Sequence, residues 1–190
     1  MRLAIADPPY PPIRAAHPRN DKSRAQFWYG DAPMSGGNSR ADQHAGAHEW
    51  DDPIRHRALL LQMEQEYDGW AIATAHDGLP AYGELPRCAR VMIWHRPNGG
   101  VGAARLRNVW EAVIIRPPTS RLSSRLMGGQ IPDLLTCPSP RTGFAGAKPP
   151  QWTRWVLDAL GYDAALDTVD DLFPGSGAVT NAIAQGVLLA

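Results

Sequence analysis

The sequence is poor in cysteine and in long apolar runs, and each of these shortages excludes a class of protein; lysine is also scarce, with only Lys22 and Lys148. It has no run of about 18 apolar residues, the length that a transmembrane helix needs, so we expect no membrane span. Its two cysteines, Cys88 and Cys137, cannot form a disulfide framework. Residues 1–6 lead directly into Asp7 and leave no room for the core of a signal peptide. These features favour a cytoplasmic protein without a membrane partner.

The sequence has no net charge, but its charges are unevenly distributed. Residues 41–86 contain nine acids and two arginines, whereas residues 87–126 contain eight arginines and one acid. A local basic block can bind phosphate although the whole chain is neutral, so this block predicts contacts with DNA. A GC-rich genome would equally encode arginine in place of lysine, and the block by itself leaves both explanations open. The candidate DNA-binding residues are Arg96, Arg105, Arg107 and Arg116.

The order of the regular elements predicts an α/β fold with a largely parallel sheet. Short apolar runs predict strands at 2–6, 70–75, 89–95, 109–116 and 167–173. Helical spacing predicts helices at 53–67, 79–85, 152–160 and 178–189. Asp52 is the expected N-cap of the first helix and Pro53 its first residue. Eighteen glycines and eighteen prolines favour long loops, which we expect at 13–50 and 117–150.

An acid, two prolines and a tyrosine follow the first predicted strand: Asp7, Pro8, Pro9 and Tyr10. Prolines lack an N–H and have a fixed φ, so they end the strand and hold the carboxylate and the ring in a fixed relation. Open α/β sheets bind ligands at the carboxyl ends of their strands. A carboxylate or carbonyl can accept hydrogen bonds from an exocyclic amine, and a tyrosine ring can stack on a flat base. The alternative interpretation is a strand terminator with an exposed acid.

A glycine-rich turn lies between the last predicted strand and the last predicted helix, and contains Asp171, Phe173, Gly175 and Gly177. Glycines allow a tight turn and let a ligand approach the backbone, while the helix N-terminus offers unpaired N–H groups. The preceding acid, Asp171, favours a small-molecule site. An isolated Gly-x-Gly is otherwise typical of a sharp turn between a strand and a helix.

Together, the Asp-Pro-Pro-Tyr motif and the Phe-x-Gly-x-Gly loop resemble the two signature motifs of S-adenosylmethionine-dependent DNA amino-methyltransferases. Their order, with the catalytic motif first and the cofactor loop last, is similar to the permuted arrangement in small phage-encoded or prophage-encoded DNA methylases. Lys148 and Pro149 resemble the Lys-Pro segment that precedes the cofactor loop in that arrangement. The resemblance implies one Rossmann-like methyltransferase domain over residues 1–190, located in a bacterial host cell, with 13–50 and 96–145 as DNA-contacting loops.

The resemblance also implies the reaction, transfer of a methyl group from S-adenosylmethionine to an exocyclic amine of a DNA base. Asp7 and the Pro8 carbonyl would hold the target amine, Pro9 belongs to the same catalytic motif, and Tyr10 would stack on the flipped base. An aspartate at the first position of the motif favours adenine N6 over cytosine N4. The expected chemistry is direct displacement, in which placement and electrostatics supply most of the rate.

The cofactor-binding residues follow from the same resemblance. Phe173, Gly175 and Gly177 would line the methionine part of S-adenosylmethionine, and Asp171 would lie near its amino group. The residues expected on the other side of this pocket are Lys148 and Pro149.

Two departures from the pattern of that family keep other functions open. Residues 178–190 contain no acid for the cofactor ribose, so another residue holds the ribose or cofactor binding is weak or lost. No sizeable target-recognition region is visible, so specificity is low or comes from a homodimer or a separate partner. The alternatives are a catalytically impaired protein that binds DNA or a partner, and another S-adenosylmethionine-dependent modification of DNA or RNA.

The sequence predicts no metal site. His44 and His48 have the spacing of two ligands on one face of a helix. Gly46 lies between them, and no cysteine or carboxylate spacing completes a coordination set, so an exposed loop is the better explanation.

Overall fold

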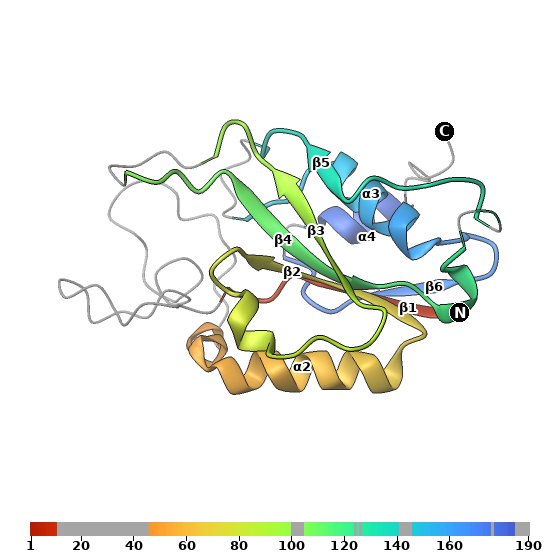
Figure 1. Ribbon diagram of the computed structural model, residues 1–190, viewed down its shortest axis with the longest axis horizontal. Helices are drawn as coiled ribbons and strands as arrows, with labels where there is room; N and C mark the ends of the chain where they lie inside the picture. The colour runs from red at the N-terminus through yellow and green to blue at the C-terminus, as the bar shows by residue number, and fades with distance from the viewer. Residues whose placement is uncertain are drawn as a thin grey trace.

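The structure is a computed structural model that describes residues 1–10, 46–99, 105–123, 125, 127–140, 146–175 and 177–184 (Figure 1). Most of the loop expected at 13–50, with His44, and part of the region 96–145 lie outside the described residues. The described ranges form a six-stranded sheet with helices on both faces.

The strands lie in the order β5-β3-β4-β2-β1-β6. β1 pairs in parallel with β2 and β6, and β3 with β5, whereas β4 pairs antiparallel with β2 and β3. The structure confirms the predicted α/β fold with a largely parallel sheet. The antiparallel pairs of β4 with β2 and β3 were not predicted. The strand bounds are β1 Arg2–Ala6, β2 Gly69–Ala75, β3 Arg90–His95, β4 Trp110–Arg116, β5 Leu134–Thr136 and β6 Thr168–Asp171.

The antiparallel pair of β3 and β4 has a simple physical reason. Parallel neighbours need a long crossover, usually a helix, whereas antiparallel neighbours need only a turn or loop. The connection at 96–109 has no helix in its described part, at 96–99 and 105–109. The loop expected at 117–150 contains β5, which extends the sheet beyond β3.

Helix α2, Pro53–Glu66, begins as the sequence predicts. The side chain of Asp52 accepts a hydrogen bond of 2.9 Å from the backbone N–H of Ile54, and Pro53 is the first helical residue. The helix ends before Tyr67, whose backbone is extended. The buried face of α2 contains Leu59, Leu60 and Met63, which pack against β1, β2 and β4.

Helices α3, Pro150–Leu160, and α4, Ala178–Ala184, contribute to the core on the other face of the sheet. Gly161 ends α3 in the left-handed region, with φ of 70°, where a side chain would be strained. Three short 3-10 helices complete the described elements: η1 Ala47–Asp51, η2 Leu79–Tyr82 and η3 Thr119–Arg121. The helix expected at 79–85 is therefore a single shorter turn.

Strand β1 contributes to the cores on both faces of the sheet because its side chains alternate. Leu3 and Ile5 pack toward α3, while Ala4 and Ala6 pack toward α2. All four are buried, so β1 is a central strand and its end is held rigidly. That end leads directly into Asp7.

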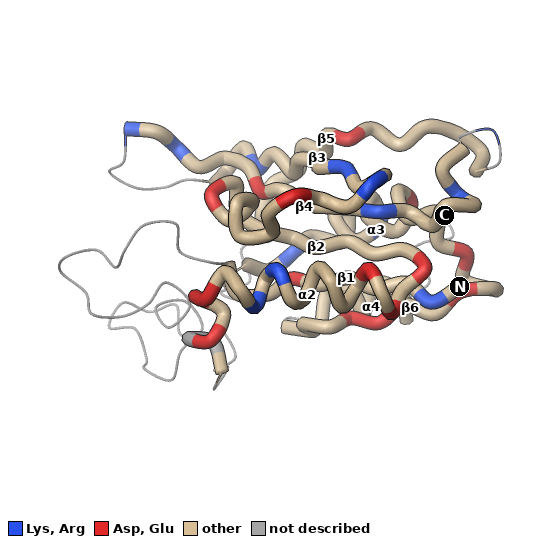
Figure 2. Tube along the Cα trace, turned by 60° about the horizontal axis from the view of Figure 1, so that its bottom comes forward, with Lys and Arg blue, Asp and Glu red and all other residues tan. Residues whose placement is uncertain are grey.

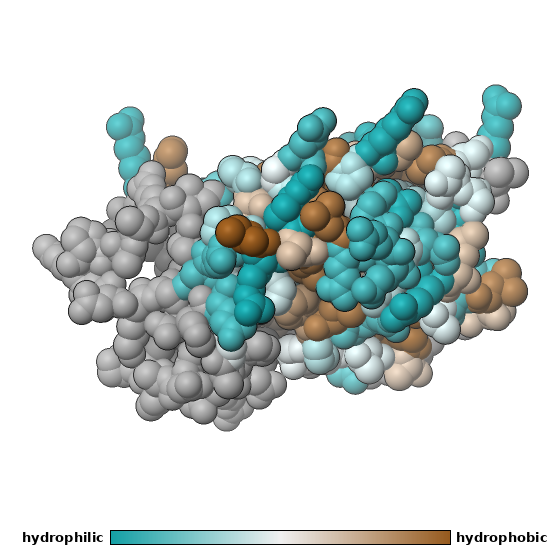
Figure 3. All heavy atoms as spheres, turned by 90° about the horizontal axis from the view of Figure 1, so that it is seen from below, coloured by the Kyte–Doolittle hydropathy of each residue, from teal (hydrophilic) through white to brown (hydrophobic). Residues whose placement is uncertain are grey.

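Helix α2 leaves part of the outer strands uncovered on its side of the sheet. Val91 and Ile93 of β3 are directly opposite Ile114 and Ala112 of β4, and are 37% and 36% exposed. Figure 3 views this side of the molecule, where hydrophobic atoms lie between hydrophilic ones. Among the described residues, no helix has both the length and the apolar character to cross a bilayer.

Candidate functional site

The two sequence motifs follow two neighbouring strands. β1 and β6 pair in parallel, with Ile5 opposite Asp171, and the N–H of Leu172 donates to the carbonyl of Ile5 at 3.0 Å (Figure 1). The carboxyl ends of parallel strands meet at one edge of a sheet, so the Asp-Pro-Pro-Tyr segment and the glycine loop begin side by side. Asp7 and Asp171 therefore lie at the same edge of the sheet, although they are 164 positions apart in the chain.

The Asp7 carboxylate is in direct contact with a buried lysine. The ammonium of Lys148 donates to Asp7 Oδ2 at 2.7 Å, to the Tyr10 hydroxyl at 3.0 Å and to the carbonyl of Gly146 at 3.1 Å. Lys148 and Pro149 precede α3, which brings the Lys-Pro segment to the end of β1. The Lys148 side chain is 4% exposed and that of Asp7 is 28% exposed, so Asp7 lies on the outer side of the pair.

A second carboxylate, Glu111 of β4, completes this cluster. The Tyr10 hydroxyl lies 2.7 Å from Glu111 Oε2 and 3.1 Å from Asp7 Oδ1. The Lys148 ammonium is 3.4 Å from the same Glu111 oxygen, and Arg96 binds the other oxygen, Oε1, at 2.7 Å. We call Asp7, Tyr10, Arg96, Glu111 and Lys148 the site cluster. Its two carboxylates are balanced by two cations.

Sequence reasoning missed Glu111, although a signal for it exists. Glu111 is the only acid in the Arg-rich block 87–126, and the next four residues of its strand are apolar. A charged residue at such a position is buried only if it is paired. The same argument applies to Lys148, which we expected beside the cofactor and which contacts Asp7.

Burial and the neighbouring charges shift the pKa values of Asp7 and Lys148 in opposite directions. Burial raises the pKa of the Asp7 carboxyl, and the neighbouring Lys148 ammonium opposes this rise without cancelling it. Burial by itself would lower the pKa of Lys148, but the charges of Asp7 and Glu111 overcome it and raise that pKa. The two neighbouring carboxylates therefore favour the charged form of Lys148.

The glycine loop has the backbone that its sequence suggests. Gly175 and Gly177 have φ of 44° and 73°, in the left-handed region that favours glycine. A Cβ at Gly177 would lie 3.2 Å from the Asn181 side chain. The Phe173 ring packs edge-on against Trp50, with 4.9 Å between ring centroids.

Asp171, before this loop, accepts a hydrogen bond of 3.2 Å from the Thr180 hydroxyl of α4. Burial raises the pKa of the Asp171 carboxyl, and the negative charge of Asp7 raises it further. The two motifs are therefore close enough to influence each other electrostatically. A pair of carboxylates at adjoining strand ends suits a positively charged ligand.

The four candidate DNA-binding arginines divide into two groups. Arg96 belongs to the site cluster, and Arg105 and Arg107 are exposed on the connection between β3 and β4, which carries basic positions at this end of the molecule (Figure 2). Arg116 lies at the other end of β4, where it pairs with Glu64 at 2.7 Å. The structure therefore separates Arg116 from the other three.

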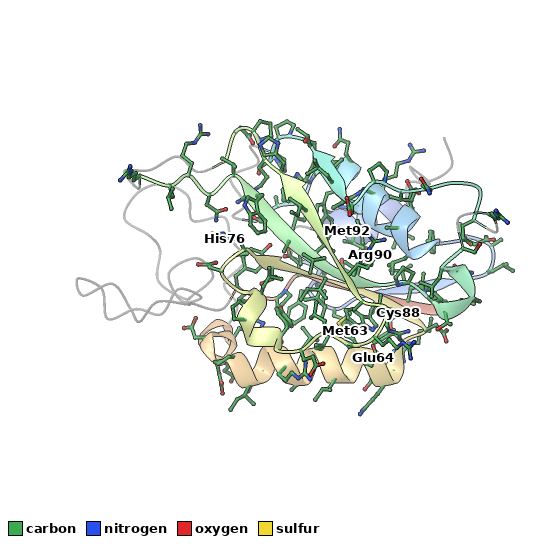
Figure 4. The ribbon with its side chains drawn as sticks, in the orientation of Figure 1. Met63, Glu64, His76, Cys88, Arg90 and Met92 are labelled. Carbon is green, nitrogen blue, oxygen red and sulfur yellow. The ribbon has the colours of Figure 1, made fainter. Side chains whose placement is uncertain are left out.

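Two further features lie at opposite ends of the sheet (Figure 4). His76 follows β2 at the site end, and its ring lies 5.4 Å from that of Trp110, which is half-buried. A cavity of about 650 Å³ opens at the other end, where its lining includes Cys88, Arg90 and Met92. This cavity is separate from the site cluster, since none of its lining residues belongs to the cluster.

The described residues contain no cluster of three or more histidine, cysteine or acidic side chains that could hold a metal ion. The sequence matches no protein-family model and no curated protein.

Proposed function

We propose that this protein is a DNA methyltransferase that transfers a methyl group from S-adenosylmethionine to an exocyclic amine of a base, with adenine N6 as the target. One observation carries the proposal: the parallel pairing of β1 and β6 joins the Asp-Pro-Pro-Tyr segment and the glycine loop at one sheet edge. A reaction between a base and a cofactor requires both to be bound at the same place, and this pairing supplies that proximity.

The residues after β1 suit an exocyclic amine. Pro8 and Pro9 are buried and have no N–H, so this backbone segment offers carbonyl acceptors only. The Asp7 carboxylate and the Pro8 carbonyl accept hydrogen bonds from the two N–H groups of the amine. This arrangement directs the nitrogen lone pair toward the glycine loop. Tyr10 holds the flipped base by stacking. The attacking nitrogen gains a positive charge, and the adjacent Asp7 carboxylate stabilises this charge and accepts the released proton.

The residues after β6 fit the methionine part of the cofactor. The Asp171 carboxylate suits an α-ammonium group, the Gly175 and Gly177 backbone leaves room for close approach, and Phe173 supplies an apolar wall. When bound, the cofactor supplies an electrophilic methyl group on a sulfonium. The two neighbouring carboxylates, Asp7 and Asp171, favour a ligand with that positive charge.

Two measurements test the proposal. Calorimetric titration of S-adenosylmethionine should show micromolar binding that Gly175→Val abolishes, because valine is strained at positive φ and fills the loop. Duplex DNA treated with the protein and cofactor should then yield N6-methyladenine on enzymatic digestion. Binding without any methylated base would support a non-catalytic DNA-binding or partner-binding role, and no binding at all would refute the cofactor site.

A further inference from the structure

The site cluster contains one carboxylate and two cations that the proposed reaction does not use. Asp7 receives the amine and Tyr10 stacks on the base, whereas Glu111, Lys148 and Arg96 have no part in that scheme. Burying charges is costly, and a structure keeps such groups only when they are closely paired. Their arrangement around Asp7 therefore points to a specific role.

The Lys148 ammonium occupies an acceptor position on Asp7 that a target amine would use. Its 2.7 Å contact with Asp7 Oδ2 is a charge-assisted hydrogen bond, stronger than a bond from a neutral amine. A second carboxylate oxygen, Glu111 Oε2, lies only 3.4 Å from the same ammonium. A small movement of the flexible lysine chain would transfer the ammonium from Asp7 to Glu111.

The surroundings make such a movement inexpensive. The ammonium lies 5.4, 5.9 and 5.6 Å from the ring centroids of Tyr10, Trp94 and Trp152, so it remains among aromatic faces wherever it sits in the cluster. Arg96 fixes Oε1 of Glu111, which leaves Oε2 directed toward Lys148 and Tyr10. The cluster keeps two negative and two positive charges in either arrangement.

The hydroxyl proton of Tyr10 is also directed toward Glu111. One hydroxyl has one proton, and its oxygen is closer to Glu111 than to Asp7, at 2.7 against 3.1 Å. A proton directed to Glu111 leaves Asp7 Oδ1 with acceptor capacity for an incoming amine. Glu111 thus positions both groups that compete for Asp7.

We propose that Lys148 is a movable counter-ion: it donates to Asp7 before the target base arrives and moves to Glu111 when the exocyclic amine takes its place. This inference rests on the proposed function. Glu111 is then a positioning residue, which acts through Lys148 and Tyr10 rather than by touching the substrate.

The chain is well suited to a direct test because it contains only two lysines, Lys22 and Lys148. In ¹⁵N-lysine-labelled Lys22→Arg protein, the single lysine ammonium resonance reports Lys148. With S-adenosylhomocysteine present, a duplex containing adenine should shift this resonance. A matched duplex with purine, which lacks the 6-amino group, should leave it unchanged. Asp7→Asn should move the resonance toward the adenine-bound position without any DNA.

The kinetic counterpart uses Glu111→Gln, which removes the charge of the second acceptor. We expect kcat/KM on adenine DNA to fall about tenfold or more, while binding of purine DNA and of cofactor stays within about twofold. Glu111→Asp should restore part of the loss, and Asp158→Asn, an acid paired with Arg154 outside the cluster, should behave as wild type.

The outcomes separate the two proposals. Wild-type methylation with a Lys148 resonance that ignores adenine, or with full activity in Glu111→Gln, would overturn this inference alone. Absence of methyl transfer by the wild type would overturn the proposed function and the inference with it.

Discussion

Asp7 and Asp167 lie at opposite ends of the sheet, and each is paired with a cation, yet their pKa values shift in opposite directions. Asp167 accepts hydrogen bonds from Arg121 and from the backbone N–H of Asp163, and these outweigh burial and lower its pKa to about 2. Among the described residues, the cation in contact with Asp7 is Lys148, which also lies close to Glu111, and burial prevails to raise the pKa of Asp7.

This difference distinguishes a carboxylate that holds two segments together from one that we propose takes part in the reaction. Arg121 and Asp167 tie the segment after β4 to the loop before β6, and the N-terminal ammonium lies 2.9 Å from the same carboxylate, so one acid there faces two cations. At the site end, two carboxylates compete for one ammonium. A carboxylate that shares its counter-ion with another acid can accept a hydrogen bond from a further donor. Acids with perturbed pKa values cluster at functional sites.

The largest expected effect comes from removing the shared cation. Lys148→Met leaves the buried Glu111 and the half-buried Asp7 with Arg96 alone, and breaking a buried pair in this way costs about 3–5 kcal/mol of folding stability. Urea unfolding at pH 7 measures the loss. The double variant with Glu111→Gln should recover part of it, whereas equal stability of Lys148→Met and wild type would show that the cluster is not coupled.

The next effect concerns activity. Asp7→Asn should lower methyl transfer by about 10²–10³-fold, the usual loss when one preorganised group at the reacting centre is removed. Cofactor binding by calorimetry should persist. Asp167→Asn is the matched control at the other end of the sheet, where transfer per folded molecule should be unchanged; a similar loss there would show that the two ends do not differ as we infer.

A smaller effect distinguishes Asp167 by its pH dependence. Its folded-state pKa lies below the unfolded value, so its contribution of about 1–2 kcal/mol, allowing for solvent screening, is complete above about pH 4 and lost as the pH falls toward 2. The stability difference between wild type and Asp167→Asn should therefore vanish on acidification. Urea unfolding between pH 7 and pH 2 measures it, and a constant difference would contradict the assignment.

The smallest effect is expected at the surface. Replacing Arg105 and Arg107 by alanine should weaken DNA binding and reduce the slope of log K against log salt by about 2, since two phosphate contacts would be lost. The matched control replaces Arg87 and Arg90, exposed at the other end of the sheet. Equal slopes for both double variants would remove the site-end arginines from the DNA interface.

Local features of the fold were predictable from the sequence. The start of α2 at Asp52 and Pro53, the end of α3 at Gly161 and the first strand all follow from caps, prolines and short apolar runs. The antiparallel strands and β5 were not predictable. Alternation of apolar residues shows that a strand exists but carries no information on which strand lies beside it.

The candidate site divides in the same way. Asp7, Tyr10 and the glycine loop stand out because each motif is contiguous in the sequence. Glu111 and the Asp7 contact of Lys148 do not, because these residues lie 104 and 141 positions from Asp7 and meet only through the sheet.

The sequence by itself determined the positions of five of the described strands and of helices α2 and α3, and which short motifs follow them, because caps, turns and side-chain alternation act over a few neighbouring residues. Only the tertiary structure decided that β1 lies between β2 and β6, and that Glu111 shares a cation with Asp7. Strand order and charge pairing depend on the burial of whole faces, a property of the assembled chain.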